Sequence, residues 1–231
     1  MTKEEYFGDW AQAIDMDGVD KMLHRIRRQA KGQVVCPAYS DIFRAFHLCP
    51  FRSVRVVVLG QDPYPTLLNG KPMATGIAFG NPKHTPEESL SPSLGILRDS
   101  VMGLYHPWER ITFDVSLEKW EKQGVLMLNT ALTCPVGKPG GHVFQWQPFT
   151  DRLLVNMGKH STGLVYILLG AQAKSYEGRI DRKFNHVLYD HHPAWYLRQG
   201  KDMPPDIWRK ANDILVSQNG YGIDWCERSN D

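Results

Sequence analysis

The stretch VRVVVLGQDPYP, residues 54–65, decides the fold. Its first half is an apolar run rich in β-branched side chains, a composition typical of a strand buried on both faces, as in a parallel sheet. Gly60 and the Asp62-Pro63 pair end the run, because Pro63 disfavours a helical conformation of the residue before it. Ligands of open α/β sheets bind in the turns that follow the carboxyl ends of the strands. Asp62 therefore lies where a binding site is expected, although capping a helix or closing an Asx-turn would also explain it.

The composition indicates one large domain. The chain has 231 residues, of which 42% are hydrophobic, enough for one substantial core, so we expect a single domain over residues 1–231. No run approaches the ~20 apolar residues of a membrane span. The first ten residues, MTKEEYFGDW, lack the basic-then-apolar order of a signal peptide. We therefore expect a cytoplasmic protein, or a nuclear one if the source is a eukaryote, that does not bind membranes.

Charge and cysteine content leave little room for a metal or cofactor. The net charge of +2 neither indicates nor excludes a nucleic-acid partner, so any anion site must come from local arrangement. Cys36, Cys49, Cys134 and Cys226 form no C-x-x-C pair of the kind that binds zinc or carries out redox chemistry. An iron–sulfur cluster held by four distant cysteines stays open, but reduced structural thiols are the expected state. We expect no metal and no cofactor.

The rest of the chain alternates strands with helices at short spacing. Apolar runs predict three further strands, at 124–133, 163–170 and 185–190. Helical spacing of apolar residues, together with capping residues, predicts helices at 19–31, 91–104, 148–160 (opened by Thr150), 171–180 and 204–220. This alternation is typical of an α/β protein, a three-layer α/β/α sandwich with a central four-stranded parallel sheet.

Two of the predicted strands also end in polar residues. Asn129 lies at the end of the strand within 124–133, and His192 closely follows the strand at 185–190. Because the carboxyl ends of parallel strands meet at one edge of a sheet, we expect Asp62, Asn129 and His192 to form one site.

Three segments resemble the signature segments of the family-1 uracil-DNA glycosylases: GQDPYP at 60–65, LMLNTALT at 126–133 and HHPAW at 191–195. Shorter matches lie between and after them in the same order and at matching intervals: GIAF at 76–79, SPSL at 91–94, WEKQGVL at 120–126, QPFTD at 147–151, IDRKFNHVL at 180–188 and GIDW at 222–225. The resemblance covers most of a core of about residues 35–225. It implies an enzyme that flips uracil out of DNA and hydrolyses its N-glycosidic bond, leaving an abasic site and starting base excision repair.

The resemblance assigns Asp62 and His192 to catalysis. Cleavage of the glycosidic bond builds positive charge on the sugar and negative charge on the departing base, and an oxocarbenium-like sugar is stabilised by a nearby carboxylate. Asp62 would supply that charge and orient the attacking water. His192, as a neutral imidazole, would donate a hydrogen bond to O2 of the uracil anion. Taken alone, His192 would be interpreted as an ordinary turn histidine.

Four further residues would bind the base. The side-chain amide of Asn129 offers an acceptor and a donor together, which match N3–H and O4 of uracil and oppose the polarity of cytosine. Tyr64 would stand against C5, where the methyl group of thymine would collide. Phe79 would stack on the extruded base, and Gln61 would hold O2 chiefly through its backbone. Without the resemblance, core packing would explain both aromatic residues, and backbone hydrogen bonding would explain Asn129.

The resemblance also implies three segments that contact DNA. Ser91 and Ser93 lie in a segment similar to the family's proline- and serine-rich loop. Ala171 lies in a segment similar to the glycine–serine loop, at a position where the family has serine. The segment HHPAWYL corresponds to the minor-groove wedge, with Tyr196 at the position of the wedging leucine and with Leu197 and Trp195 as alternatives.

Two departures concern the pocket wall. Pro65 follows Tyr64 where the family has a histidine, and the loop from there to Phe79 is longer than usual. Together with the altered wedge and Ala171, these differences affect the grip on DNA more than base recognition.

Other functions stay open from the sequence. One is a glycosylase-like module that binds DNA with little catalysis. A second is an α/β hydrolase of small molecules, although the G-x-S-x-G nucleophile elbow is absent. GKPGG at 137–141 lacks the remainder of a phosphate-binding loop, and His191 and His192 would point apart on an extended strand rather than share a metal ion.

The expected partner is uracil-containing DNA, single- or double-stranded. Proteinaceous glycosylase inhibitors are a further partner class that the resemblance implies, and we expect a monomer.

Overall fold

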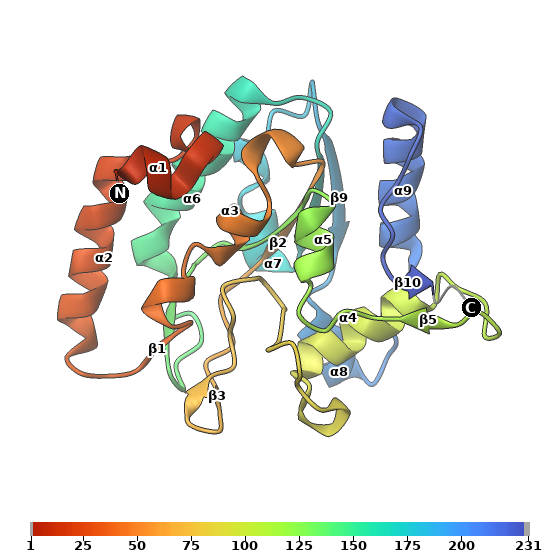
Figure 1. The fold of residues 1–231 in the computed structure, drawn as a ribbon, viewed down its shortest axis with the longest axis horizontal. Coiled ribbons are helices and arrows are strands. Elements are labelled where there is room, and N and C mark those ends of the chain that lie inside the picture. The colour runs from red at the N-terminus through yellow and green to blue at the C-terminus, as the bar shows by residue number, and fades with distance from the viewer. Residues whose placement is uncertain (1, 229–231) are drawn as a thin grey trace.

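A computed structural model describes residues 2–228 of the chain, so Met1 and residues 229–231 of the expected domain lie outside the described part. A four-stranded sheet with strand order β6-β2-β8-β9 forms the centre (Figure 1). Its strands are β2 (Val56–Gly60), β6 (Val125–Asn129), β8 (Val165–Leu169) and β9 (His186–Asp190). Every neighbouring pair is parallel, which confirms the predicted α/β class and the central four-stranded parallel sheet.

Helices pack on both faces of this sheet. One face carries α1 (Lys3–Phe7), α2 (Met16–Ala30), α3 (Arg44–Leu48), α6 (Val143–His160) and α7 (Ala171–Lys174). The other carries α4 (Pro92–Met102), α8 (Pro193–Gln199) and α9 (Asp206–Asn219), while α5 (Glu118–Lys122) lies beside β6. Short 3-10 turns occur at Gly8–Gln12, Tyr39–Asp41, Phe51–Ser53, Glu87–Ser89 and Glu177–Arg179.

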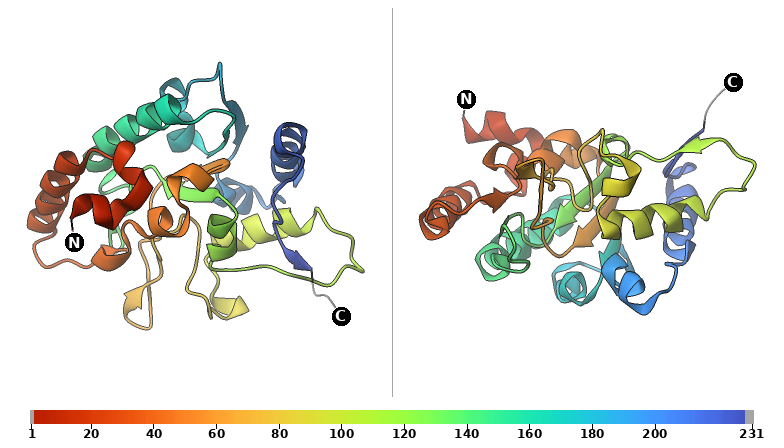
Figure 2. Two further views of the ribbon diagram at one scale, coloured as in Figure 1. Left: turned by 45° about the horizontal axis from the view of Figure 1, so that its top comes forward. Right: turned by 90° about the horizontal axis from the view of Figure 1, so that it is seen from below.

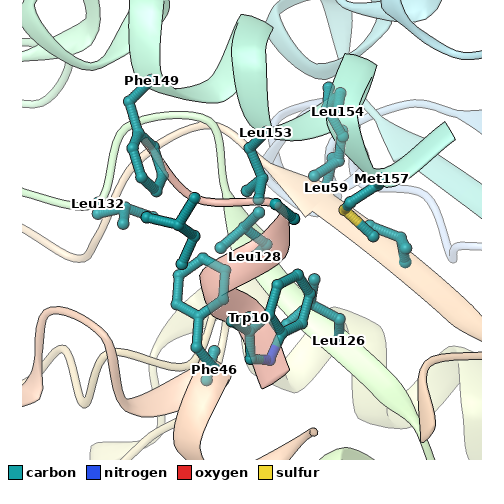
Figure 3. Packing of buried hydrophobic residues seen from close by; sticks show 14 of the residues in the cluster. Trp10, Phe46, Leu59, Leu126, Leu128, Leu132, Phe149, Leu153, Leu154 and Met157 are labelled. Carbon is teal, nitrogen blue, oxygen red and sulfur yellow. The ribbon is translucent and has the colours of Figure 1, made fainter. Parts of the chain in front are cut away.

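The apolar run of strand β2 is almost unbroken because both faces of the strand are covered. Successive side chains of a strand point to opposite faces. Val57 and Leu59 accordingly join the core under α6 (Figure 3), whereas Val56 and Val58 join the core under α4 and α9. All five residues of the strand are buried. A strand covered on both sides needs apolar side chains at every position, and this gives the sequence its distinctive segment.

Two predicted helices differ from the structure. The helix expected at 148–160 begins at Val143, so Thr150 does not open it and Pro148 lies inside it. Pro148 lacks the N–H that would bond the carbonyl of Phe144, but both residues face solvent, so water can satisfy that carbonyl. The segment expected to be helical over 171–180 is divided into α7 and a 3-10 turn.

Three small antiparallel pairs lie outside the main sheet. They are β1 (Val35–Cys36) with β7 (Cys134–Pro135), β3 (Leu67–Leu68) with β4 (Lys71–Pro72), and β5 (Ile111–Thr112) with β10 (Glu227–Arg228). The β3–β4 hairpin projects from the body of the molecule (Figures 1 and 2) and accounts for the long loop that precedes Phe79. Within residues 2–228, no helix combines the length and the apolar character needed to cross a membrane.

Glu121 of α5 is a fully buried carboxyl group beside the edge strand β6. Its Oε1 accepts the backbone N–H of Met127 at 2.9 Å, and its Oε2 has no hydrogen-bond partner in the structure. Burial raises the pKa of Glu121 well above its usual value, although this hydrogen bond and the charge of Arg44 oppose the rise. The folded state therefore favours the protonated acid, and stability is lost as the pH rises above the carboxyl's ordinary pKa.

We expect Glu121→Gln to stabilise the protein at pH 8 by roughly 1 kcal/mol or more, because glutamine needs no proton uptake on folding and keeps the acceptor for Met127. The gain should shrink towards pH 4, where the carboxyl is protonated in either state. Urea unfolding of the two proteins at both pH values measures it. Glu88→Gln, which neutralises an exposed glutamate, should change little. Equal stabilities of wild type and Glu121→Gln at pH 8 would contradict this account.

Candidate active site

The carboxyl ends of the sheet strands open into a cavity of about 530 Å³. Asp62 comes from the turn after β2, Asn129 ends β6, and His192 follows β9 and begins α8. All three line this cavity together with Gln61, Tyr64, Phe79, Ser93 and Ala171. The predicted convergence of polar strand ends at one sheet edge is confirmed.

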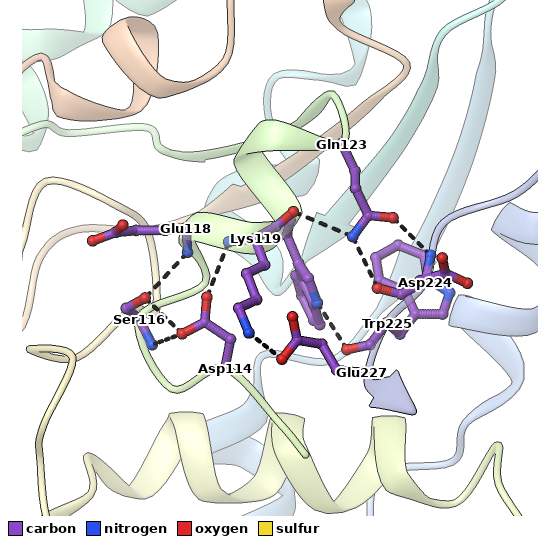
Figure 4. Close-up of polar contacts among 9 residues, drawn as sticks. Asp114, Ser116, Glu118, Lys119, Gln123, Asp224, Trp225 and Glu227 are labelled. Carbon is purple, nitrogen blue, oxygen red and sulfur yellow. Dashed lines mark hydrogen bonds and ion pairs between the residues drawn. The ribbon is translucent and has the colours of Figure 1, made fainter. Parts of the chain in front are cut away.

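A larger, open cleft of about 900 Å³ lies elsewhere, between α9 and the β5–β10 pair. It contains none of the predicted site residues. Its polar side chains tie the C-terminal strand to α5: Lys119 pairs with Glu227, and Gln123 exchanges two hydrogen bonds with the backbone of Asp224 (Figure 4). These contacts explain the residues of the cleft as structural, so we place the chemistry in the smaller cavity.

Both carboxylate oxygens of Asp62 accept hydrogen bonds. The side-chain amide of Gln61 donates to Oδ1 at 3.1 Å, and the backbone N–H of Gly140 donates to Oδ2. Burial raises the pKa of Asp62 above its ordinary value, while the two donors oppose that rise because they stabilise the ionised form. The carboxylate is therefore fixed in one orientation just beyond the carboxyl end of β2.

His192 is held as a neutral imidazole. Its Nδ1 accepts the backbone N–H of Ala194 at 3.2 Å, which leaves the ring proton on Nε2 as a donor. Burial, with a smaller contribution from the positive charge of Arg198, lowers the pKa of His192 to about 4. At neutral pH the side chain can thus donate one hydrogen bond without carrying a charge, as the predicted role requires.

Gly60, the last residue of β2, lies close to two residues that line the cavity, Asn129 and Phe79. A Cβ at that position would lie 2.5 Å from Oδ1 of Asn129 and 3.0 Å from Cε2 of Phe79, so any side chain there would displace both. Phe79 itself adopts a left-handed backbone with φ of 64°, a conformation that costs on the order of 1 kcal/mol for a residue other than glycine. Its ring lies 5.5 Å from the ring of His192. These contacts bring an amide, an aromatic ring and an imidazole to one small volume.

Tyr64 forms a wall of the cavity, and its hydroxyl donates to the carbonyl of Phe79 at 3.0 Å. Of the two predicted serines, Ser93 lines the cavity whereas Ser91 does not. Ser91 is buried and forms two hydrogen bonds of 2.8 Å with the side chain of Asn81. Its structural role is therefore to hold the loop that precedes α4.

The structure corrects the expectation for the wedge. Tyr196 is only 7% exposed, packs in the core under α4 and donates its hydroxyl to Asp190. Helix α8 begins at Pro193, and one turn of helix turns Tyr196 inward and the next residue outward. Leu197 is 50% exposed. Tyr196 is thus not available to enter DNA in this conformation, and Leu197, one of the two alternatives, is.

Trp195, the third apolar residue of the wedge segment, also contacts another side chain of the protein. Its ring stacks on that of His191 with centroids 3.9 Å apart. The structure shows no group of three or more His, Cys, Asp or Glu side chains arranged for a metal anywhere in residues 2–228. All four cysteines are buried free thiols.

Two contributors to the site were not predicted. Gly60 lies close to Asn129 and Phe79, and the backbone N–H of Gly140 reaches Asp62 from a loop that follows β7. The only signal in the sequence for the second was the cluster of glycines at 137–141, which by itself indicates a turn rather than a partner for a carboxylate.

Comparison with known proteins agrees with the resemblance seen in the sequence. A family model described as the uracil DNA glycosylase superfamily matches residues 46–216. A uracil-DNA glycosylase of Erwinia tasmaniensis is 35% identical over 85% of this chain and 84% of its own length. One of Vibrio parahaemolyticus is 32% identical over 96% of this chain and 91% of its own.

Solved structures share the fold. Mimivirus uracil-DNA glycosylase aligns with a TM-score of 0.74 at 22% identity, covering 97% of this chain and 93% of its own. A single-residue variant of mimivirus UNG in complex with UGI aligns with a TM-score of 0.79 at 23% identity, covering 97% and 88%.

Proposed function

This chain belongs to the uracil-DNA glycosylase family, and from that premise we propose that Asp62, Asn129 and His192 carry out its reaction. The protein is a uracil-DNA glycosylase, an N-glycosyl hydrolase of base excision repair. The observation that carries the residue assignment is the convergence of these three side chains, from three different strand ends, on one cavity.

Base recognition is assigned to residues that line the cavity. The amide of Asn129 pairs with N3–H and O4 of an extruded uracil, while the ring of Phe79 stacks on its face. Tyr64, fixed by its hydrogen bond to the carbonyl of Phe79, closes the space at C5. A methyl group at C5 would meet this wall, so thymine is excluded by shape and cytosine by polarity.

Catalysis is assigned to two groups, one that stabilises the positive charge on the sugar and one that stabilises the negative charge on the departing base. The carboxylate of Asp62 stabilises the cationic sugar and orients the attacking water, and Nε2–H of His192 donates to O2 of the departing uracil anion. A neutral imidazole serves this role because an imidazolium would pair with Asp62 before the base leaves. The low pKa of His192, about 4, supports that assignment.

The substrate we propose is uracil in single- or double-stranded DNA, bound by a monomer that acts in the cytoplasm, or in the nucleus of a eukaryote. Structural neighbours include complexes of UNG with UGI, and a proteinaceous inhibitor is accordingly a candidate partner. A binding module with little catalysis is the less favoured alternative, because Asp62 and His192 both line the cavity and hydrogen bonds orient each of them.

The direct test is incubation with a uracil-containing oligonucleotide and a matched thymine-containing one, followed by alkaline cleavage. Strand breakage at uracil alone, persisting in excess chelator, is the expected result. Intact strands with tight binding to uracil DNA would favour the binding module instead. Loss of activity on chelation, restored by one metal, would contradict cofactor-free chemistry.

Leu197 is the proposed wedge, because it is an exposed apolar side chain on the short helix α8. A side chain that fills the gap left by the flipped nucleotide matters only where a base pair must be opened. We expect Leu197→Ala to slow excision from duplex DNA by about tenfold, a barrier change of about 1.4 kcal/mol, and to change excision from single strands by less than about twofold. Single-turnover rates on the two substrates provide the measurement.

Tyr196→Phe serves as the matched variant for the wedge. It removes only the hydroxyl that bonds Asp190, and its effect should be equal on both substrates. A duplex-specific loss with Tyr196→Phe and none with Leu197→Ala would reverse the assignment.

A further inference from the structure

The loop of residues 137–141, here called the Gly140 loop, contacts Asp62 and contributes to the lining of the cavity. The backbone N–H of Gly140 donates to Oδ2 of Asp62, and the neighbouring Pro139 lines the cavity. Residues 62 and 140 are 78 positions apart in the chain. This contact joins the turn after β2 to the segment between β7 and α6.

The Gly140 loop is held firmly at both ends. At its start, the N–H of Gly137 donates to the carbonyl of Pro65 at 2.7 Å, which ties the loop to the wall that carries Tyr64. At its end, the carbonyl of Gly140 accepts the N–H of Val143 at 3.2 Å, at the beginning of α6.

Buried side chains fix the residues that follow the loop. The hydroxyl of Thr133 lies 2.9 Å from Nδ1 of His142 and accepts the indole N–H of Trp146 at 2.7 Å. A Cβ at Gly141 would lie 2.8 Å from the ring of Pro135, so the backbone is closely packed there as well. The N–H of Gly140 is therefore presented to Asp62 by a rigid support.

Glycine at 140 is required by the backbone. Its φ is +77°, a left-handed conformation that a side chain disfavours, although the space around its Cα is open. Gly137 has the same character, with φ of +71° and nothing within 4 Å of a built Cβ, but its N–H bonds Pro65 instead of Asp62. The chain thus contains a matched pair of glycines in one loop, of which one contacts the catalytic carboxylate.

We propose that Gly140 is a positioning residue of the glycosylase reaction, whose backbone N–H holds Oδ2 of Asp62 so that the carboxylate faces the sugar and the attacking water. The inference depends on the proposed catalytic role of Asp62. The only other donor that the structure shows on this carboxylate, within residues 2–228, is the flexible side chain of Gln61. A backbone donor on a rigid loop fixes orientation at a lower cost in conformational entropy than a side chain does.

The contact also bears on the ionisation of Asp62. A hydrogen bond to the charged form favours it, so losing the Gly140 donor should raise the pKa of Asp62 further and move the acid limb of the rate profile to higher pH. The other titratable or charged groups around the carboxylate are Tyr64, His192 and Arg198, which line the same cavity, and the buried Cys134. Removal of the Gly140 N–H would leave all of these side chains unchanged.

The test replaces single backbone amides by esters, through incorporation of glycolic acid at position 140 or, as the matched control, at position 137. Each ester removes one N–H of the loop and keeps the conformational freedom of glycine. We expect the ester at 140 to lower the single-turnover excision rate about tenfold, to shift the acid limb upward in pH and to leave the affinity for uracil DNA within about twofold. The ester at 137 removes the anchor to Pro65 but leaves the Gly140 donor on Asp62, so it should lower the rate less than the ester at 140 does and leave the acid limb in place.

Two outcomes would overturn the inference. One is equal behaviour of the two esters. The other is an equal, tenfold loss when the 140 ester is introduced into Asp62→Asn, because a residue that acts through Asp62 must lose its effect once that carboxylate is gone. These outcomes differ from a failure of the proposed function, which would appear as a wild-type protein that does not excise uracil.

Discussion

Replacing Asp62 by asparagine is expected to lower the single-turnover rate of uracil excision by about 10²–10³-fold, the range seen when one preorganised electrostatic group is removed from an active site. The substitution keeps the size of the side chain but only one acceptor oxygen, so one of the two donors, Gln61 or Gly140, loses its acceptor. It removes the negative charge that stabilises the cationic sugar. Affinity for uracil DNA should be unchanged or slightly higher, because the charge that repels phosphate is gone.

The comparison needs a rate and a binding constant from the same preparations. Asp202→Asn, which neutralises an exposed aspartate, controls for the change in net charge and should leave the rate within about twofold of wild type. A rate for Asp62→Asn equal to that of wild type would remove Asp62 from the mechanism. A parallel loss of rate and affinity would assign it to binding instead.

The parts of the site that could be predicted from sequence are those determined by local pattern. The apolar run before Gly60 indicates a doubly covered strand, because only such a strand lacks polar alternation. Parallel topology then places Asp62, Asn129 and His192 at one edge. Each of these residues lies within a few positions of a strand end, so its location follows from the strand itself.

The parts that sequence could not supply depend on contacts between distant segments. Gly140 meets Asp62 because the β1–β7 pair and the start of α6 hold its loop there, and no periodicity encodes that approach. Tyr196 turned out to be buried because α8 begins at Pro193 and rotates it onto the core, whereas matching it by position assumes the backbone of its relatives. Side-chain direction in a short helix depends on the residue at which the helix begins.

Selectivity for uracil should depend on Asn129 more than on any other side chain. Its amide lies close to Gly60, and the ring of Phe79 packs near the same glycine, so a mismatched base has little room to shift and find other partners. A buried site that hydrogen-bonds its substrate rejects an analogue of the wrong polarity by about 10⁴–10⁵-fold. We expect Asn129→Asp to reduce the discrimination against cytosine by at least about 10²-fold, because a protonated carboxyl group can accept from the N4 amino group and donate to N3.

The pH dependence of this variant distinguishes the mechanism from simple loosening of the pocket. An ionised carboxylate can accept from N4 but cannot donate to N3, so cytosine excision by Asn129→Asp should increase as the pH falls towards the pKa of the new carboxyl group. Tyr64→Ala provides the complementary variant: it should admit thymine by removing the wall at C5, and should leave cytosine excluded because Asn129 is intact. Rates on oligonucleotides that differ only in the target base would measure both. If Asn129→Asp releases no cytosine at any pH and Tyr64→Ala releases no thymine, the flipped base does not occupy this cavity in the proposed orientation.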